Sequence, residues 1–148
     1  MPILTVDQLD EILNDLRMNS KVSGILLTGS YVYGTPKETS DVDICCVTSD
    51  GSDWAELERM QFGVPINIFY NPPDVVRKYM IKSVEEGHGD CVHFWANGKI
   101  FYDSSGIMQK LQTEARKLWK AGPGNNKQWE WRWKKHNGGY SAQDWELP

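Results

Sequence analysis

Apolar residues recur along this chain at two spacings, one typical of amphipathic helices and the other typical of strands. The helical spacing is carried near the start by four apolar residues, Leu9, Ile12, Leu13 and Leu16. Together with the capping-box pair Thr5 and Gln8, this spacing predicts a helix over residues 6–18. Short apolar or alternating runs predict four strands, at residues 24–28, 41–47, 64–70 and 99–102.

Further segments have the composition or spacing of helices. They are residues 53–60, a segment that starts at Pro72 and Pro73 and ends near Gly87, and residues 107–120. Residues 91–96 stay open, because Asn97-Gly98 suits both a hairpin turn and the end of a short helix. The alternation of helices and strands predicts an α/β (α+β) fold, in which a small mixed β-sheet is flanked by helices.

Length, charge and cysteine content narrow the class of protein. The chain has 148 residues, of which 40% are hydrophobic, enough for one domain with a single core. Its net charge of −4 makes nucleic acid an unlikely main partner, because binding a phosphate backbone needs a surplus of Lys and Arg. Without a signal-peptide pattern or a bilayer-spanning apolar run, we expect a soluble, cytoplasmic protein with no membrane partner. The three cysteines are expected to be reduced.

Two polar motifs follow the first predicted strand. Gly29 and Ser30 form a small-residue turn, and Asp41 and Asp43 lie one residue apart at the start of the next strand. Because successive side chains on a strand point to opposite faces, the two carboxylates share a face and can bind one cation. The turn leads into a helix, so its backbone N–H groups can bind an anion. A phosphate bound to Mg²⁺ would satisfy both motifs.

The stretch from Leu27 to Ile44 resembles the signature of the nucleotidyltransferase superfamily related to DNA polymerase beta. A looser similarity, to small bacterial or phage-type members near the aminoglycoside nucleotidyltransferases, extends to about Leu118 and favours a helix over residues 91–96. The resemblance implies a nucleotidyltransferase fold, with Asp41 and Asp43 as catalytic residues and as ligands of Mg²⁺ or Mn²⁺. It also implies four nucleotide-binding residues, Gly29, Ser30, Ser40 and Asn67.

The implied reaction moves a nucleoside monophosphate from a nucleoside triphosphate, expected to be ATP, to a hydroxyl group. The hydroxyl acceptor, on a small molecule, a protein or an RNA, is not identified by the sequence. The resemblance also makes residues 1–121 the catalytic domain. Beyond a linker-like break, tryptophans alternate with basic and polar residues, and we expect residues 122–148 to be a Trp-rich tail. This tail would pack on the domain or on a partner, such as a second copy of the chain or another protein.

One position departs from the family pattern. Many members carry a third carboxylate where this chain has Asn67, so the general-base role has no evident residue. Three explanations stay open: the nucleotide-bound metal suffices, another acid substitutes, or catalysis is lost while nucleotide binding remains. The acids considered as substitutes are Asp74, Glu85 and Asp103. The third explanation corresponds to an alternative function, a catalytically weakened nucleotide-binding or antitoxin-like interaction module.

The histidines and cysteines suggest a weaker alternative, a zinc site. His88, Cys91 and His93 are close in sequence, but their mixed spacing is a poor match to a zinc site. Cys45 and Cys46 are adjacent on a predicted strand, so only one of them can face a given site. We expect buried thiols here to act as small apolar core residues.

Overall fold

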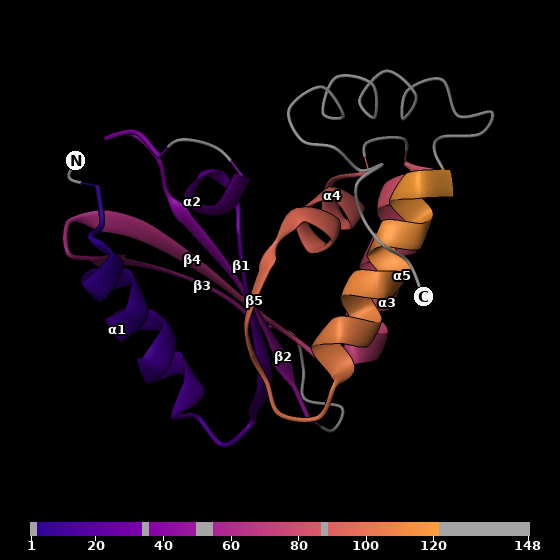
Figure 1. Ribbon diagram of the computed structural model, residues 1–148, viewed down its shortest axis with the longest axis horizontal. Coiled ribbons are helices and arrows are strands. Elements are labelled where there is room, and N and C mark those ends of the chain that lie inside the picture. The colour runs from indigo at the N-terminus through magenta and orange to yellow at the C-terminus, as the bar shows by residue number, and fades with distance from the viewer. Residues whose placement is uncertain (1–2, 34–35, 50–54, 87–88, 122–148) are drawn as a thin grey trace.

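The computed structural model describes residues 3–33, 36–49, 55–86 and 89–121, which form a five-stranded mixed sheet with helices on both faces (Figure 1). The strands are β1 (Val22–Thr28), β2 (Val42–Thr48), β3 (Ala55–Gln61), β4 (Val64–Asn71) and β5 (Lys99–Asp103). The helices are α1 (Val6–Arg17), α2 (Ser30–Tyr33), α3 (Pro73–Glu85), α4 (Asp90–Asn97) and α5 (Ile107–Ala121). The strand order is β3-β4-β2-β1-β5, in which β2 and β4 are parallel and the other neighbouring pairs are antiparallel.

Local sequence explains where several helices begin. Thr5 accepts a hydrogen bond from the backbone N–H of Gln8, and the Gln8 side chain accepts one from the backbone N–H of Thr5, so the predicted capping box is confirmed. Pro73 begins α3, where its missing N–H leaves no helical hydrogen bond unmade. The carboxylate of Asp103 accepts hydrogen bonds from three backbone N–H groups at the start of α5.

The predicted helix over residues 53–60 is wrong, because residues 55–61 form β3 at one edge of the sheet. The segment is rich in Ala, Glu, Leu and Arg, which favour a helix, but antiparallel pairing with β4 overrides this local preference. Phe62 (φ 51°) and Gly63 (φ 75°) are both left-handed, as a tight two-residue hairpin turn requires. The sequence signal for the hairpin is Gly63, directly before the alternating run of β4.

The other predicted strands and helices are confirmed, with small differences at their ends. Residues 91–96, which suited both a turn and a helix, lie within α4. The predicted tail, residues 122–148, lies outside the described residues. Within the described ranges, no helix has the length and apolar character needed to cross a membrane.

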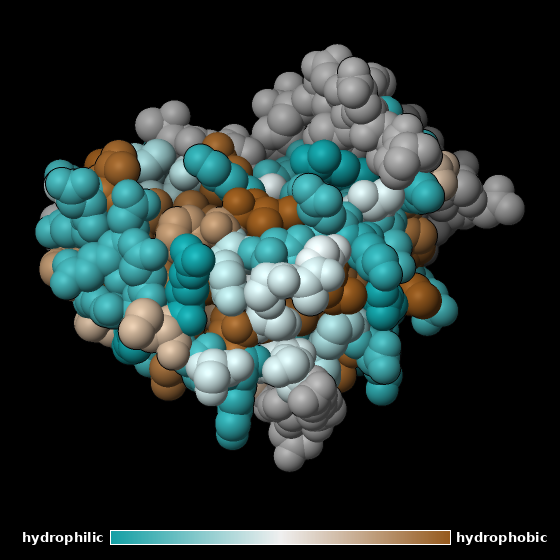
Figure 2. All heavy atoms as spheres, turned by 60° about the horizontal axis from the view of Figure 1, so that its bottom comes forward, coloured by the Kyte–Doolittle hydropathy of each residue, from teal (hydrophilic) through white to brown (hydrophobic). Residues whose placement is uncertain are grey.

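The sheet separates two hydrophobic cores. On the α1 face, which α1 covers, Ile25, Leu27 and Ile44 pack with buried residues of the helix. On the opposite face, called here the α3 face, Leu26 and Val47 pack with α3, α4 and α5. Figure 1 shows this arrangement, with α1 on one side of the sheet and α3, α4 and α5 on the other. The surface seen in Figure 2 is mainly hydrophilic, with hydrophobic residues in small separate patches.

Candidate active site

Asp41 and Asp43, at the start of β2, meet Asn67 in the middle of β4. The Nδ2 atom of Asn67 donates hydrogen bonds to Oδ2 of Asp41 at 2.7 Å and to Oδ1 of Asp43 at 3.1 Å. One amide nitrogen therefore bridges both carboxylates, which confirms that they project from the same face of the strand. Asp41 is exposed and Asp43 is half-buried, so the pair borders both solvent and the interior of the fold.

A row of four paired residues crosses the sheet at this level. Thr28 on β1 pairs with Asp43, Asp43 pairs with Asn67, and Asn67 pairs with Glu58 on β3. Directly paired residues on neighbouring strands point to the same face. The Thr28 hydroxyl donates a hydrogen bond to the carbonyl oxygen of Phe94 in α4 at 3.2 Å, so this row lies on the α3 face.

Gly29 holds the turn after β1 against Asp43. Its φ of +84° is left-handed, a conformation that a side chain disfavours. A Cβ atom at this position would lie 2.9 Å from Oδ2 of Asp43, so the backbone approaches the carboxylate closely. Ser30 follows as the first residue of α2. The Gly-Ser turn and the carboxylate pair are therefore adjacent in space as well as ordered in sequence.

Ser40 shapes the loop that leads to Asp41. Its Oγ accepts a hydrogen bond from the backbone N–H of Lys37 at 2.9 Å, and its backbone N–H donates to the carbonyl oxygen of Lys37 at 2.9 Å. These two bonds close a turn directly before the carboxylate pair. Contact between Ser40 and a nucleotide stays a prediction.

The electrostatics of Asp43 favour a bound cation. Burial raises the pKa of the Asp43 carboxyl above its usual value of 3.8, and the negative charge of Asp41 raises it further. The hydrogen bond from Asn67 acts in the opposite direction, because it stabilises the charged carboxylate. A cation between the two carboxylates would relieve their repulsion. Paired carboxylate oxygens are ligands that suit Mg²⁺ or Mn²⁺, so the residues present fit such an ion.

The acids considered as substitutes for a third carboxylate have structural positions instead. Asp74, in the first turn of α3, is 98% exposed and forms an ion pair with Arg77 at 3.4 Å. Glu85 is exposed near the end of α3. Asp103 caps α5 and pairs with Gly24. Gly24 lies toward the opposite end of β1 from Thr28, so Asp103 is distant from the row. None of these three acids belongs to the row on the α3 face.

The histidine and cysteine alternative is not supported by the described residues. No group of three His, Cys, Asp or Glu side chains in this part of the chain is arranged to hold a metal ion. His93 is buried in α4 with its ring 5.3 Å from that of Trp119, and His88 lies outside the described ranges. Cys46 lies in the core of the α1 face whereas Cys45 lines a pocket on the α3 face, so the adjacent thiols do face opposite sides.

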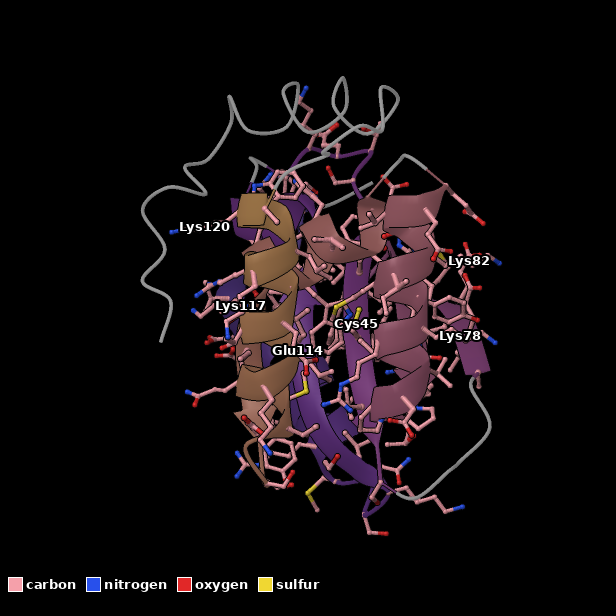
Figure 3. All side chains as sticks on the ribbon, turned by 90° about the vertical axis from the view of Figure 1, so that its right-hand side faces the viewer. Cys45, Lys78, Lys82, Glu114, Lys117 and Lys120 are labelled. Carbon is pink, nitrogen blue, oxygen red and sulfur yellow. The ribbon has the colours of Figure 1, made fainter. Side chains whose placement is uncertain are left out.

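The pocket on the α3 face has a volume of about 440 Å³ and opens beside the row. Its floor includes Cys45, Phe69 and Glu56, each two residues along its strand from a member of the row. Helices α3 and α4 supply the remaining walls, with the aromatic side chains Tyr79, Phe94 and Trp95 and the charged side chains Lys82, Glu86 and Asp90. Figure 3 shows Cys45 on the sheet between the ribbons of α3 and α5, with Lys82 on α3. Aromatic walls with an excess of acidic groups thus adjoin the carboxylate pair.

Glu56 and Glu58 are the residues that sequence reasoning missed. Both lie in the segment predicted as a helix, where they had no defined relation to Asp41 and Asp43. Their alternation with Leu57 and Arg59, followed by Gly63, was the available signal for a strand. Pairing with β4 places both glutamates on the face that carries the carboxylate pair.

Known proteins are similar to this chain in sequence or in fold. A family model described as a nucleotidyltransferase domain matches residues 9–120. The chain is 36% identical over 89 residues to "Putative protein adenylyltransferase MJ1547" of Methanocaldococcus jannaschii, across 57% of this chain and 73% of that protein. A nucleotidyltransferase-like protein from Exiguobacterium sibiricum is similar in structure, with a TM-score of 0.55 and 14% identity. That match covers 74% of this chain but spans only 38% of the length of the other, and it shows the fold alone.

Proposed function

The chain belongs to the nucleotidyltransferase domain family, and on this premise we propose that it transfers a nucleoside monophosphate from a nucleoside triphosphate to a hydroxyl acceptor, using Mg²⁺ held by Asp41 and Asp43. The observation that carries this proposal is that the carboxylate pair, Asn67 and the turn at Gly29 lie together. The two carboxylates converge on Asn67, and the left-handed turn at Gly29 packs against Asp43. A carboxylate pair for a cation beside a backbone turn for phosphate is the arrangement that a metal–triphosphate complex requires.

The proposed reaction uses each part of the site differently. Backbone N–H groups at Gly29 and Ser30 would orient the β- and γ-phosphates, and the two carboxylates would hold the cation. Bound Mg²⁺, or Mn²⁺ in its place, would stabilise the negative charge that gathers on the phosphate oxygens. The acceptor oxygen bonds to the α-phosphorus, the bond from that phosphorus to the bridging oxygen breaks, and pyrophosphate leaves.

ATP is the proposed donor and a protein hydroxyl the proposed acceptor. The name of the archaeal relative describes a protein adenylyltransferase, and this chain covers most of that relative. The pocket on the α3 face agrees with an acceptor of this kind. Its aromatic walls suit an apolar or aromatic side chain, and its acidic groups suit a basic neighbouring residue.

Binding to the native state tests the donor site without an acceptor. We expect ATP with Mg²⁺ at about 100 times its dissociation constant to raise the melting temperature by about 5–10 °C, because ligand binding shifts the unfolding equilibrium. Asp43→Asn should abolish this shift, while Asp10→Asn, a change of the same kind at an exposed position of α1, should retain it. The absence of a Mg²⁺-dependent shift with any of the four nucleoside triphosphates would refute the proposal.

Transfer itself is then measured with ATP labelled at the α-phosphate. Candidate acceptors are peptides with Tyr, Ser or Thr, small polyhydroxylated amines, and RNA. We expect label on a peptide hydroxyl, released pyrophosphate, and no label with Asp43→Asn. Label confined to the small molecule or to RNA would retain the reaction class and replace the acceptor.

A second function, nucleotide binding without transfer, is favoured by one observation. Asn67 supplies a neutral amide between the two carboxylates, where a third acid would add charge and a base. If the natural protein binds ATP without turnover and Asn67→Asp gives turnover, the chain is a binding module that has lost its activity. Turnover by the natural protein excludes this second function.

A further inference from the structure

We propose that Glu58 is the general base that takes the proton from the acceptor hydroxyl. The inference rests on the proposed function and assigns the role that Asn67 leaves vacant. An uncharged amide has no lone pair basic enough to accept this proton, and the Asn67 nitrogen already donates to both aspartates. The base must therefore come from another strand or helix around the site.

Strand register places Glu58 next to Asn67. The two residues pair directly across β3 and β4, and side chains paired in this way lie about 5 Å apart at Cβ on one face of the sheet. Glu56, two positions along β3, lines the pocket on the α3 face. Because residues two apart on a strand share a face, Glu58 projects to the α3 face as well.

The direction of the reaction also places the base on the β3 side of the site, where Glu58 lies. In phosphoryl and nucleotidyl transfer, the attacking and leaving oxygens lie roughly in line through the phosphorus. Gly29 and Ser30 follow β1, so they would hold the leaving pyrophosphate on the β1 side of Asp43. The acceptor must then approach from the opposite side, over β4 and β3. Glu58 is the acid of the paired row on that side.

The spacing of the strands leaves room for the acceptor hydroxyl between the Asp41–Asp43 pair and Glu58. Two strand intervals separate β2 from β3, which is about 10 Å. Among the described residues, no third acid, histidine or cysteine joins Asp41 and Asp43 closely enough to share an ion. Glu58 therefore stands apart from the cation site, and the spacing of about 10 Å between β2 and β3 leaves space for a hydroxyl group between them. Its side chain is exposed, so it can adjust its rotamer to that hydroxyl.

The proton and electron pairs balance in the proposed step. The Glu58 carboxylate takes the hydroxyl proton and becomes a carboxylic acid, while the acceptor oxygen forms a bond to the α-phosphorus. The bond between this phosphorus and the bridging oxygen breaks, and its electron pair leaves with pyrophosphate. Solvent then takes the proton from Glu58 and restores the carboxylate for the next turnover.

The test compares Glu58→Gln with the natural protein. The probes are ATP and Mg²⁺, with water, glycerol and peptides that contain Tyr, Ser or Thr as hydroxyl acceptors, and the readout is pyrophosphate release. We expect Glu58→Gln to lower the rate about 100-fold or more, as loss of a general base does. Stabilisation by ATP and Mg²⁺ should persist, because Glu58 does not bind the cation. Glu85→Gln, which removes an exposed glutamate from α3, serves as the matched control and should retain the natural rate.

Two rescue measurements separate catalysis from support of the fold. Formate should partly restore pyrophosphate release to Glu58→Ala, because a small carboxylate can enter the space left by the side chain. Asn67→Asp added to Glu58→Gln should also restore part of the rate, because it places a carboxylate on β4, one strand nearer to Asp43 than β3. Failure of both rescues would assign Glu58 a structural role and overturn the inference.

The two proposals fail in different ways. A natural rate in Glu58→Gln overturns the role of Glu58 and leaves nucleotidyl transfer standing. A natural protein that releases no pyrophosphate with water, glycerol or any of the peptide, polyhydroxylated amine and RNA acceptors, although ATP and Mg²⁺ stabilise it, overturns the catalytic function and the base together.

Discussion

The two halves of the candidate site differ in how firmly the fold holds them. The half formed by β1 and β2 lies inside the sheet, where Asp43 is flanked by Thr28 and Asn67 and touched by the turn at Gly29. The half that β3 completes lies at the sheet edge, where Glu58 is exposed. In the proposed reaction, a site built in this way would hold the metal and phosphates rigidly and still admit acceptors of different shape. Four changes test this difference, starting with the largest expected effect.

Asp43→Asn should lower nucleotidyl transfer by more than about 100-fold, because it removes a proposed charged ligand of the cation. The same change should stabilise the metal-free protein by up to about 1 kcal/mol, since it removes a charge that burial and Asp41 disfavour. Enzyme assays and urea unfolding measure the two effects. Asp41→Asn, at an exposed position, should cause a similar loss of transfer with a smaller gain in stability. Equal gains in stability would contradict the difference in burial.

Gly29→Ala should destabilise the protein by about 1–2 kcal/mol and weaken ATP binding, because alanine is strained at this positive φ and its Cβ would crowd Asp43. Gly106→Ala is a matched control. Gly106 has nearly the same φ, +82°, but a Cβ atom there meets nothing within 4 Å. The difference between the two variants measures the close approach of the turn to the carboxylate. If both lose the same stability and Gly29→Ala binds ATP normally, the turn does not support the nucleotide site.

Lowering the pH should weaken Mg²⁺-dependent ATP binding as it falls through the raised pKa of Asp43, which lies above 3.8. Protons and Mg²⁺ compete for the carboxylate, so the apparent affinity should fall at most about tenfold per pH unit. Stability of the metal-free protein should change in the opposite sense. A folded-state pKa above the unfolded one favours folding at low pH, and this contribution is lost as pH rises through the folded value. Calorimetric titrations and urea unfolding across pH 4–7 separate the two trends, and parallel trends would contradict the assignment.

Leu57→Thr should have the smallest effect. Leu57 is 44% exposed and lies on β3 next to Glu58, but its side chain points to the opposite face of the sheet. Threonine retains the preference for a strand, so we expect stability within about 0.5 kcal/mol of the natural protein and an unchanged rate of pyrophosphate release. A loss of activity as large as that of Glu58→Gln would mean that β3 as a whole, rather than the Glu58 side chain, supports the reaction.

The difference between the two halves also explains what the sequence could predict. Gly29, Asp41 and Asp43 lie within a short stretch whose chemistry follows from strand alternation and one turn, so the sequence alone predicts their meeting in space. Asn67 could be placed by the family pattern. Glu58 could not, because its neighbours favour a helix locally, and only long-range pairing with β4 makes the segment a strand.

The helices show the same contrast. Capping at Thr5 and the proline start of α3 are local signals, and the structure follows both. The pocket between the sheet and α3 and α4 depends on side chains from distant parts of the chain, such as Cys45, Phe69 and Phe94. Periodicity in a single sequence carries no information about which of these distant residues will share a cavity.

The position of Asn67, which bridges Asp41 and Asp43, has a consequence for the evolution of the site. Asparagine and aspartate have nearly the same size and shape, and their codons differ at a single base. One point mutation can therefore change the formal charge of the Asp41, Asp43 and residue 67 cluster from −2 to −3 with little change in side-chain volume, although it removes the amide donor that bridges the two aspartates. Descendants of this gene can gain or lose a third acid at this position in a single mutational step, while the turn at Gly29 and the sheet beneath it are inherited unchanged.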